Sequence, residues 1–255
     1  MRYTFGTTKK AANRLGDIAR VFNPMAAEFL TKYITGEIET ALDLGCGPGF
    51  TTDMIYRALE CKKVYGFDNS KEMLEYAKKQ FNHCSFILHN ITDFPFPIKP
   101  DLMYVRFLLS HIENVIELAN KWLNELKKGG YLFIEEVEDI DTDVDVFKKY
   151  LSINRGLIAS ERAVLYVGKI LSAGNYNAKI LYNKKISLPV NNSTAASWFY
   201  PNTVTIWKKE KYVLNNLSGE ERENISNELL RILKENDASS NITWYMRRIL
   251  LRKGL

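Results

Sequence analysis

The sequence predicts an α/β fold in which a mostly parallel sheet carries helices on both faces. From residue 41 onward, short apolar runs alternate with stretches of helical periodicity, as in chains that build parallel sheets. A turn with glycines at alternate positions, Gly45, Gly47 and Gly49, follows the first of these runs. Strand, glycine-rich turn and helix in this order open a ligand site in many α/β proteins, so the turn is the starting point for function.

Composition limits the function classes that need to be considered. The 255 residues suffice for one domain, 1–255, with a helical lid. The net charge of +5 is too small and too scattered to argue for nucleic acid. The cysteines, Cys46, Cys61 and Cys84, lack the spacing of a disulfide framework or metal site, which indicates a reducing compartment. No leader or membrane-length apolar run is found, so we expect a cytoplasmic protein without a membrane partner.

The N-terminal residues 1–36 are expected to form a lid of two helices. An apolar face at helical spacing marks the first helix, with Leu15, Ile18, Ala19 and Phe22. Asn23 and Pro24 are typical of an N-cap and the first helical position, so a second helix is predicted to begin there.

Two acids flank the glycine turn at informative positions. Asp43 lies in the first strand, Ala41–Leu44, two residues before Gly45. The glycine spacing is G-x-G-x-G, whereas the dinucleotide fingerprint is G-x-G-x-x-G. An unpaired carboxylate at this place would repel a pyrophosphate and suit a cationic ligand. Asp68 ends the second strand, Val64–Asp68, at a distance from the turn at which an acid meets a ribose diol.

Residues 42–49, Leu-Asp-Leu-Gly-Cys-Gly-Pro-Gly, resemble motif I of the class I S-adenosylmethionine-dependent methyltransferases, of small-molecule, quinone or natural-product type. The resemblance implies a Rossmann-like seven-stranded sheet of order 3-2-1-4-5-7-6 with strand seven antiparallel. It also implies S-adenosyl-L-methionine as cofactor, whose ammonium and sulfonium groups agree with the two acids. The implied cofactor-binding residues are Arg14, Asp43, Gly45, Gly47, Gly49, Asp68, Asn69, Met73, Asn90, Ile91 and Arg106.

One of these positions departs from the family pattern. The family usually has an Asp after the third strand, here Cys84–Leu88, whereas this chain has Asn90. An amide oxygen can still accept a hydrogen bond from the adenine amino group, so the implied role is kept.

The fourth strand, Asp101–Val105, leads into a stretch that the resemblance implicates in catalysis. Residues 106–111, Arg-Phe-Leu-Leu-Ser-His, resemble the R-F-x-L-x-H stretch of quinone- and natural-product-type methyltransferases. Methyl transfer from a sulfonium is an in-line displacement that needs alignment and a deprotonated acceptor. We therefore expect His111 to act as general base and Arg106 to position an acceptor oxygen, with structural roles as the alternatives.

The composition of the chain becomes strongly acidic at the end of the fifth strand, Tyr131–Glu135. Seven acids crowd into residues 135–145, which we interpret as a solvated acidic loop, or alternatively as a mouth that attracts a cationic amine. A helical insertion at 145–175 is expected to cover the pocket, before strand six at 177–188. The aromatic cluster 198–200 is interpreted as core packing, with the lid's inner wall as the alternative. A capping box begins a helix at Ser218, and a last strand covers 242–251.

The leading functional hypothesis is methyl transfer to oxygen, nitrogen or carbon of a small-molecule acceptor. No metal is expected, because Arg106 and Leu108 occupy positions where metal ligands would begin. An RNA or protein methyltransferase would need a basic surface or a further binding domain. A cofactor-binding regulator without activity on the same fold is the third hypothesis. The oligomeric state is open, a homodimer included.

Overall fold

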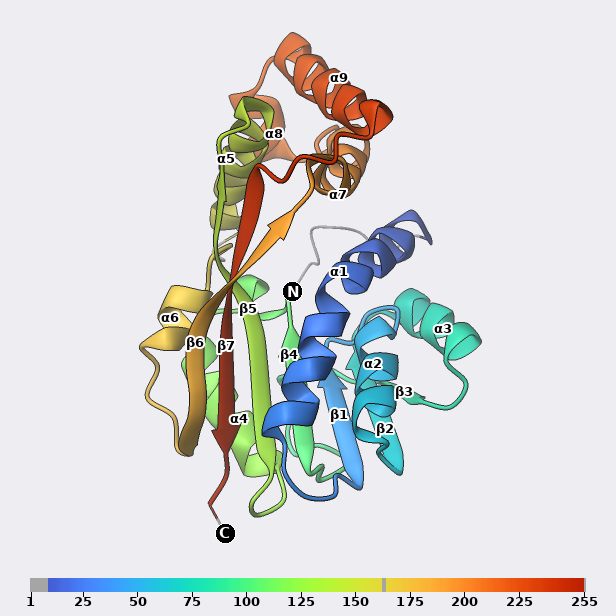
Figure 1. Cartoon of the computed structure of the whole chain (residues 1–255), viewed down its shortest axis with the longest axis vertical. Helices are drawn as coiled ribbons and strands as arrows, with labels where there is room; N and C mark the ends of the chain where they lie inside the picture. The colour runs from blue at the N-terminus through green and yellow to red at the C-terminus, as the bar shows by residue number, and fades with distance from the viewer. Residues whose placement is uncertain (1–8, 162–163, 255) are drawn as a thin grey trace.

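The computed structural model describes residues 9–161 and 164–254, and its centre is one seven-stranded sheet. The order of the strands is β3-β2-β1-β4-β5-β7-β6 (Figure 1). Their bounds are β1 Thr40–Leu44, β2 Lys63–Asp68, β3 Ser85–Leu88, β4 Leu102–Arg106, β5 Tyr131–Thr142, β6 Lys179–Val190 and β7 Ile242–Arg252. The first five strands are mutually parallel, and β7 runs antiparallel to both β5 and β6. The predicted fold class and strand order are therefore confirmed.

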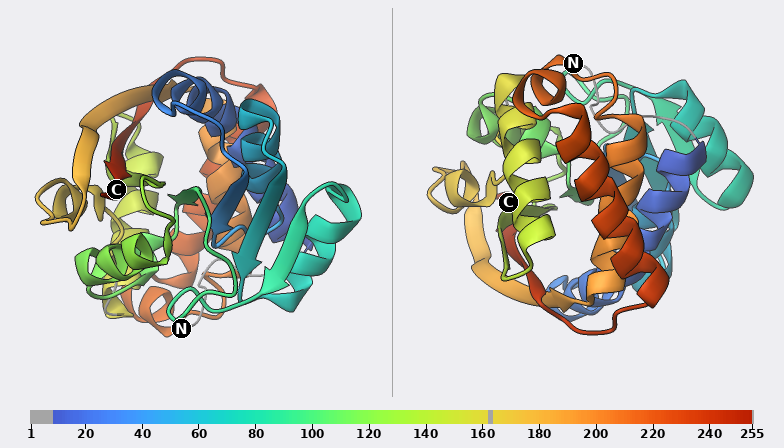
Figure 2. Two further views of the ribbon diagram at one scale, coloured as in Figure 1. Left: turned by 90° about the horizontal axis from the view of Figure 1, so that it is seen from below. Right: turned by 90° about the horizontal axis from the view of Figure 1, so that it is seen from above.

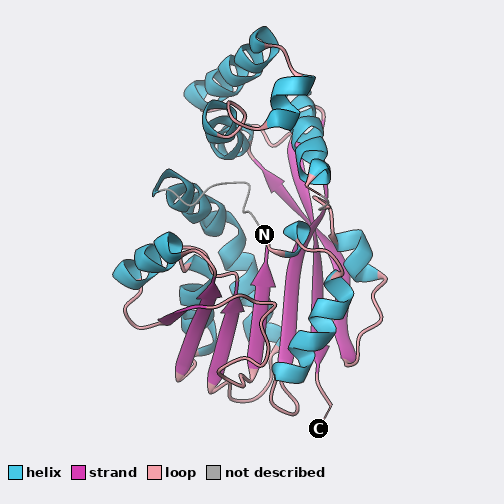
Figure 3. Ribbon diagram, turned by 180° about the vertical axis from the view of Figure 1, so that it is seen from behind, coloured by secondary structure: helices cyan, strands magenta, loops and turns pink. Residues whose placement is uncertain are grey.

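Helices cover both faces of this sheet. The helices of the sheet region are α1 Lys9–Tyr33, α2 Phe50–Leu59, α3 Lys71–Gln80, the short η1 Leu109–His111, α4 Val115–Glu125 and α6 Gly168–Ser172. Helices α1 and α2 lie on one face, and α4 lies on the other (Figures 1 and 3). Alternate residues of a strand point to opposite faces, so Leu42 and Leu44 join the core beneath α4 while Ala41 joins the core beneath α1.

A helical layer stands beyond the carboxyl ends of the parallel strands. Its members are α5 Asp145–Ser160, α7 Asn192–Thr205, α8 Lys211–Asn216 and α9 Gly219–Glu235. Strands β5, β6 and β7 extend past the rest of the sheet and carry this layer (Figure 1). From above, α9 lies between α5 and α7 (Figure 2). A third apolar core, including Phe147, Phe199 and Trp244, holds the layer together.

The helical layer is larger than the expected lid. The predicted insertion at 145–175 contains α5 and α6, apart from residues 162–163, which lie outside the described part of the chain. Most of the layer instead comes from residues 192–235, between β6 and β7. Of the predicted N-terminal lid, 1–36, residues 1–8 are likewise outside the described part.

The prediction of two N-terminal helices is wrong, because α1 continues through Pro24. An internal proline removes one helical hydrogen bond. Burial on both sides of it, at Phe22 and Phe29, offsets this loss. The side chain of Asn23 is also fixed, since it donates to Phe50 O at 2.9 Å and accepts from Arg106 Nη2 at 2.6 Å.

The interpretation of residues 135–145 as a solvated acidic loop is also wrong. Strand β5 continues to Thr142, and Glu135, Glu136 and Glu138 are buried. Arg248 Nε donates to Glu135 Oε1 at 2.6 Å, and Arg247 Nε donates to Glu138 Oε2 at 2.6 Å. These partners are on β7, more than a hundred residues further along the chain, so local sequence gave no indication of them.

None of the helices within 9–161 and 164–254 is long and apolar enough to span a membrane.

Candidate active site

The glycine turn between β1 and α2 needs its glycines for two reasons. Gly45, Gly47 and Gly49 have φ of +68°, +51° and +87°, a region that other residues rarely adopt. A Cβ on Gly45 would lie 2.8 Å from the Leu108 side chain, and one on Gly49 would lie 2.8 Å from the Phe86 ring. On Gly47 the nearest atom would be Leu15 Cδ1 at 3.8 Å, so the space beside this glycine is open.

The amides of this turn are used within the protein. Cys46 N donates to Phe67 O at 2.9 Å, Gly47 N to Asp68 Oδ2 at 2.8 Å, and Gly49 N to Cys46 O at 3.0 Å. Pro48 has no N–H. A pyrophosphate bound at a glycine turn requires such amides as donors, so the turn is poorly suited to a dinucleotide.

Asp68 lies at the carboxyl end of β2, beside the turn. Its second oxygen, Oδ1, accepts from Ser70 N at 2.8 Å, and burial raises the pKa of the carboxyl. Each carboxylate oxygen has two lone pairs, so both can accept a further hydrogen bond from a ligand hydroxyl. Asp68 therefore gives the site a fixed acceptor with a predetermined orientation.

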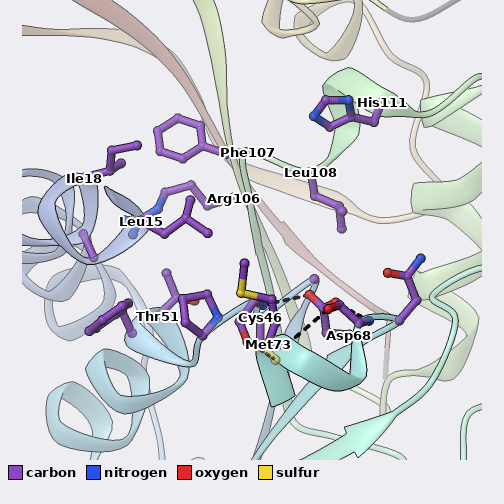
Figure 4. A pocket seen from close by; sticks show the side chains of 17 residues that line it. Leu15, Ile18, Cys46, Thr51, Asp68, Met73, Arg106, Phe107, Leu108 and His111 are labelled. Atoms are coloured by element: carbon purple, nitrogen blue, oxygen red, sulfur yellow. Dashed lines mark hydrogen bonds between the residues drawn. The ribbon is translucent and has the colours of Figure 1, made fainter. Parts of the chain in front are cut away.

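A lower cavity opens between the glycine turn, α1, the start of α3 and the loop after β4 (Figure 4). Its lining is Leu15, Ile18, Ala19, Gly45, Cys46, Gly47, Pro48, Phe50, Thr51, Asp68, Asn69, Ser70, Met73, Arg106, Phe107, Leu108 and His111. The structure thus brings together Gly45, Gly47, Asp68, Asn69, Met73 and Arg106 of the predicted cofactor residues, and His111 with them.

Asp43 is outside this lining, in a buried position under the turn. Its Oδ2 accepts from Thr51 Oγ1 at 2.5 Å and from Thr52 Oγ1 at 2.7 Å. Burial raises the pKa of this carboxyl to about 6, although both hydroxyls favour the ionised form. Asp43 therefore fixes the start of α2, and through Thr51 it contacts the cavity wall.

Four other predicted cofactor residues are also outside the lining of the lower cavity: Gly49, Asn90, Ile91 and Arg14. The Asn90 amide nitrogen donates to Asp93 Oδ1 at 3.1 Å, and Ile91 O accepts from Trp122 Nε1 at 2.9 Å. Arg14 donates to Asn202 of α7, above the cavity. Their roles toward the cofactor stay predictions.

Arg106 connects the sheet to α1. Its Nη2 donates to Asn23 Oδ1 at 2.6 Å, and its Nη1 lies 3.6 Å from Glu135 Oε2. The guanidinium also lies 5.6 Å from the ring centroid of Phe107 and 5.9 Å from that of Phe22. This position gives Arg106 a structural role in the cavity wall in addition to its predicted role toward the acceptor.

The loop after β4 is held by Glu136, a residue that the sequence did not single out. Glu136 Oε1 accepts from Leu108 N at 2.7 Å and from Leu109 N at 2.8 Å. Burial raises the pKa of this carboxyl to about 7. Phe107 begins the loop with φ of +55°, which is unusual for a residue with a side chain. Nothing in the local pattern distinguishes Glu136 from its acidic neighbours.

His111 lies at the end of the same loop. Burial lowers the pKa of its imidazole, so the neutral form, which can accept a proton, is favoured at neutral pH. The side chain lines the lower cavity and also a second, upper cavity.

The upper cavity lies between α1, the β4 loop, β5 and the helical layer. Its lining is Arg14, Leu15, Ile18, Phe22, Phe107, Ser110, His111, Glu136, Val137, Ile140, Tyr150, Leu151, Asn154, Leu165, Trp198, Phe199, Asn202 and Trp244. It shares Leu15, Ile18, Phe107 and His111 with the lower cavity. The sequence had indicated Trp198 and Phe199 mainly as core; the structure places them in the third core and in this wall.

The fold and the site together define the class. A β3-β2-β1-β4-β5-β7-β6 sheet, with a glycine turn after β1 and an acid at the end of β2, is the arrangement that the resemblance to class I S-adenosylmethionine-dependent methyltransferases implies. The cofactor of that class is S-adenosylmethionine.

Comparisons with known proteins agree with this class. Residues 41–130 match the family model described as a methyltransferase domain. Curated relatives include trans-aconitate 2-methyltransferases of Enterobacter sp. (strain 638), 28% identical over 51% of this chain and 52% of the relative, and of Variovorax paradoxus (strain S110), 32% identical over 43% of each. The chain thus spans about half the length of the curated relatives it matches.

A solved structure extends the likeness of fold to the whole chain. Coclaurine N-methyltransferase bound to N-methylheliamine and S-adenosylhomocysteine is 18% identical, with a TM-score of 0.59 over 99% of this chain and 76% of the other. The predicted family resemblance is therefore confirmed: residues 41–130 match the methyltransferase domain model, and the whole chain has a fold similar to that of a solved methyltransferase.

In the described ranges, no group of three or more His, Cys, Asp or Glu side chains is arranged to hold a metal ion.

Proposed function

We propose that the chain transfers a methyl group from S-adenosylmethionine to a small-molecule acceptor by in-line displacement. The lower cavity would hold the cofactor, and the upper cavity would hold the acceptor. The observation that supports this is the wall that the two cavities share, which includes His111 and Phe107. A donor and an acceptor placed on its two sides would be neighbours at the loop after β4, as a displacement reaction requires.

The lining of the lower cavity fits S-adenosylmethionine. Asp68 supplies carboxylate oxygens for ribose hydroxyls, and the side chain of Met73 supplies an apolar contact for a ring. The space beside Gly47 stays open because no Cβ fills it. The turn amides are already bonded, which suits a cationic ligand better than a phosphate. When bound, the cofactor supplies a methyl group activated by a positive sulfur.

The residues at the boundary of the cavities would prepare the acceptor. His111, neutral at neutral pH, would take a proton from the acceptor O–H or N–H. Arg106 lines the lower cavity and not the upper one, so it would position an acceptor oxygen only where the acceptor reaches past the shared wall, while Asn23 and Glu135 hold its guanidinium. The leaving sulfur departs uncharged, so no general acid is needed.

A small acceptor is favoured over a macromolecule. The upper cavity is lined by α5 and α7 of the helical layer, and its lining is mostly apolar, with few of the basic side chains that a nucleic acid would need. The curated relatives are named for a small molecule, trans-aconitate. Methylation on oxygen, nitrogen or carbon, a cytoplasmic location and a homodimer remain predictions.

The first test is the affinity for S-adenosylhomocysteine. Asp68→Ala removes the acceptor oxygens from the lower cavity, so we expect binding to weaken at least tenfold, about 1.4 kcal/mol, by calorimetry. Asp145→Ala, which removes a highly exposed carboxylate, should leave the affinity unchanged. Equal affinities for both variants, or no binding by the unchanged protein, would contradict the proposal.

A further inference from the structure

One wall of the upper cavity carries a buried cation. Arg14 of α1 lines this cavity and is only 8% exposed. Within 9–161 and 164–254, it is the only lining side chain with a permanent positive charge, because burial lowers the pKa of the His111 imidazole and favours its neutral form. A guanidinium stays charged even when it is buried. The cavity therefore has a fixed positive charge in its wall.

Two residues of the helical layer orient this guanidinium. Arg14 Nη1 donates to the amide oxygen of Asn202 on α7, and Asn202 Nδ2 donates to the Tyr150 hydroxyl on α5 at 2.6 Å. Both partners line the same cavity. A guanidinium has five N–H donors in a planar fork, and pairs of them match the two oxygens of a carboxylate. The direction of the fork is thus set by the protein before a ligand binds.

The acidic groups of the lining do not cancel this charge. In the part of the chain that the structure describes, only Glu136 and Tyr150 among the lining residues can become anionic. Glu136 Oε1 accepts from two backbone amides, and burial raises the pKa of its carboxyl to about 7. Burial also raises the pKa of Tyr150 to about 12, so its hydroxyl is uncharged at neutral pH. At neutral or slightly acidic pH the wall therefore favours an anion over a cation.

Most of the remaining lining is apolar. Phe22 of α1 meets Phe107 of the β4 loop edge-on, with ring centroids 5.1 Å apart. Trp198 of α7 meets Trp244 of β7 edge-on at 5.2 Å. A second charge on a ligand would face side chains of this kind, and burying a charge without a partner is costly. The lining thus suits a ligand with one anionic group and an apolar remainder.

We propose that Arg14 binds a carboxylate at one end of the acceptor, and that the rest of the acceptor is apolar and extends to the shared wall at His111. This inference rests on the proposed function, whose acceptor it specifies. Arg14 does not line the lower cavity, so the carboxylate end lies away from the methyl donor. The inference gives Arg14 to the acceptor in place of its predicted role toward the cofactor.

The test uses protein saturated with S-adenosylhomocysteine, in slightly acidic buffer, and three probes that share a 4-hydroxyphenyl ring. The carboxylate probe is 3-(4-hydroxyphenyl)propionate, and the amide probe is 3-(4-hydroxyphenyl)propionamide, its uncharged analogue. The amine probe is tyramine, which carries an ammonium. We expect calorimetry to show that the carboxylate probe binds at least tenfold more tightly than the amide probe, and that the amine probe binds no more tightly than the amide probe.

Variants identify the group that binds the carboxylate probe. Arg14→Gln removes the charge, whereas Asn202→Asp keeps the guanidinium and places a competing carboxylate beside it. Each should weaken the carboxylate probe at least tenfold and abolish its advantage over the amide probe, while S-adenosylhomocysteine still binds. Arg20→Gln is the matched control, because it removes an exposed arginine of the same helix that pairs with Asp17 and does not line the cavity. This control should bind all three probes as the unchanged protein does.

The outcomes distinguish the inference from the function on which it rests. No binding of the carboxylate probe, equal binding of the carboxylate and amide probes, or tightest binding of tyramine would overturn the inference alone, provided that S-adenosylhomocysteine binds. A folded Arg14→Gln variant that loses S-adenosylhomocysteine but keeps the carboxylate probe would assign Arg14 to the cofactor and also overturn it. Failure of the unchanged protein to bind S-adenosylhomocysteine would overturn the proposed function, and the inference with it. The probe comparison on the unchanged protein does not depend on whether a variant folds.

Discussion

Two carboxyl groups near the cavities, Asp43 and Glu136, are buried and accept hydrogen bonds from neighbouring segments. Burial raises their pKa values to about 6 and about 7. A folded-state pKa above the unfolded value means that the folded protein holds protons which the unfolded chain has released. The stability from each group is therefore fully present at low pH and is lost as the pH rises through the folded pKa.

Glu136→Gln tests this linkage. The amide oxygen of Gln can still accept from Leu108 N and Leu109 N, while the ionisation is removed. For the unchanged protein we expect the free energy of unfolding to fall between about pH 4.5 and 7, by up to ~3 kcal/mol from this group. The variant should show a flatter profile in urea titrations over the same range.

The control for this experiment is Glu113→Gln, which changes an exposed glutamate on the same loop. Its profile should follow that of the unchanged protein. If Glu136→Gln and the unchanged protein had parallel profiles, Glu136 would not hold the extra proton.

For single residues, the sequence predicted which ones lie near the site better than it predicted their hydrogen-bond partners. Gly45, Gly47, Asp43 and Asp68 were singled out by spacing within one turn and two strand ends, and the structure places all of them except Asp43 in the wall of the lower cavity. The bonds of Asp43 to the threonines of α2 and the bonds of Glu136 to the β4 loop depend on side-chain direction and burial. Local sequence records neither side-chain direction nor burial. Asp43 was therefore expected to line the cavity, whereas it is buried beneath the cavity.

The start of helix α9 was predicted from the sequence, together with the hydrogen bonds that fix it. Ser218 accepts from Glu221 N at 3.1 Å, and Glu221 accepts from Ser218 N at 2.7 Å, so the predicted capping box is confirmed. The signal is complete within four residues, which is why it could be recognised without knowledge of the fold.

Ser218→Ala should destabilise the helical layer. Loss of an N-cap hydroxyl typically costs about 1 kcal/mol, and we expect that decrease in the free energy of unfolding by urea titration. Ser226→Ala in the middle of the same helix is the control, because Ser226 only donates back to Arg222 O and Ala favours a helix. A decrease in Ser226→Ala as large as that in Ser218→Ala would argue against the capping contribution.

Elements whose ends depend on distant contacts were predicted less well. Helix α1 passes Pro24, and β5 runs to Thr142, where the sequence had indicated a boundary and a loop. In both cases tertiary burial outweighs a local signal: Phe22 and Phe29 pack on either side of the proline, and arginines of β7 neutralise the glutamates of β5.

Across the whole molecule, a buried polar cluster joins three strands of the sheet. Glu135 of β5 accepts from Tyr104 of β4 at 2.7 Å and from Arg248 of β7 at 2.6 Å, with Arg106 of β4 nearby. Because β7 lies between β5 and β6 and leads back from the helical layer, this cluster couples that layer to the parallel strands of the sheet.

Arg248→Met should weaken that coupling. Removing one partner leaves Glu135 with Arg106 as its remaining cation in the cluster, and we expect the free energy of unfolding to fall by roughly 3 kcal/mol in urea titrations. The double variant Glu135→Gln/Arg248→Met should recover part of this loss. Arg252→Met, on an exposed part of the same strand, should change it by less than about 0.5 kcal/mol. A double variant no more stable than Arg248→Met would contradict the account.

The overall topology could be predicted because it follows from the alternation of strands and helices and from the family resemblance of the glycine turn. The size of the helical layer could not, because residues 192–235 carry helical periodicity but no local mark of where they dock. The upper cavity was therefore only partly predictable: the insertion that contributes Tyr150 and Asn154 was expected to cover the pocket, whereas Trp244 of β7 becomes their neighbour only in the folded chain.

The helices α7 to α9 are inserted between β6 and β7, and the position of this insertion affects how its sequence can be exchanged. Val190 and Ile242, which precede and follow the excursion, are paired across β6 and β7. The two ends of the segment that contains α7, α8 and α9 are therefore adjacent and held by the pairing of β6 with β7. A different set of helices could replace this segment without a change in the strands. Such an exchange would replace Trp198, Phe199 and Asn202 in the wall of the upper cavity while leaving the lining of the lower cavity unchanged.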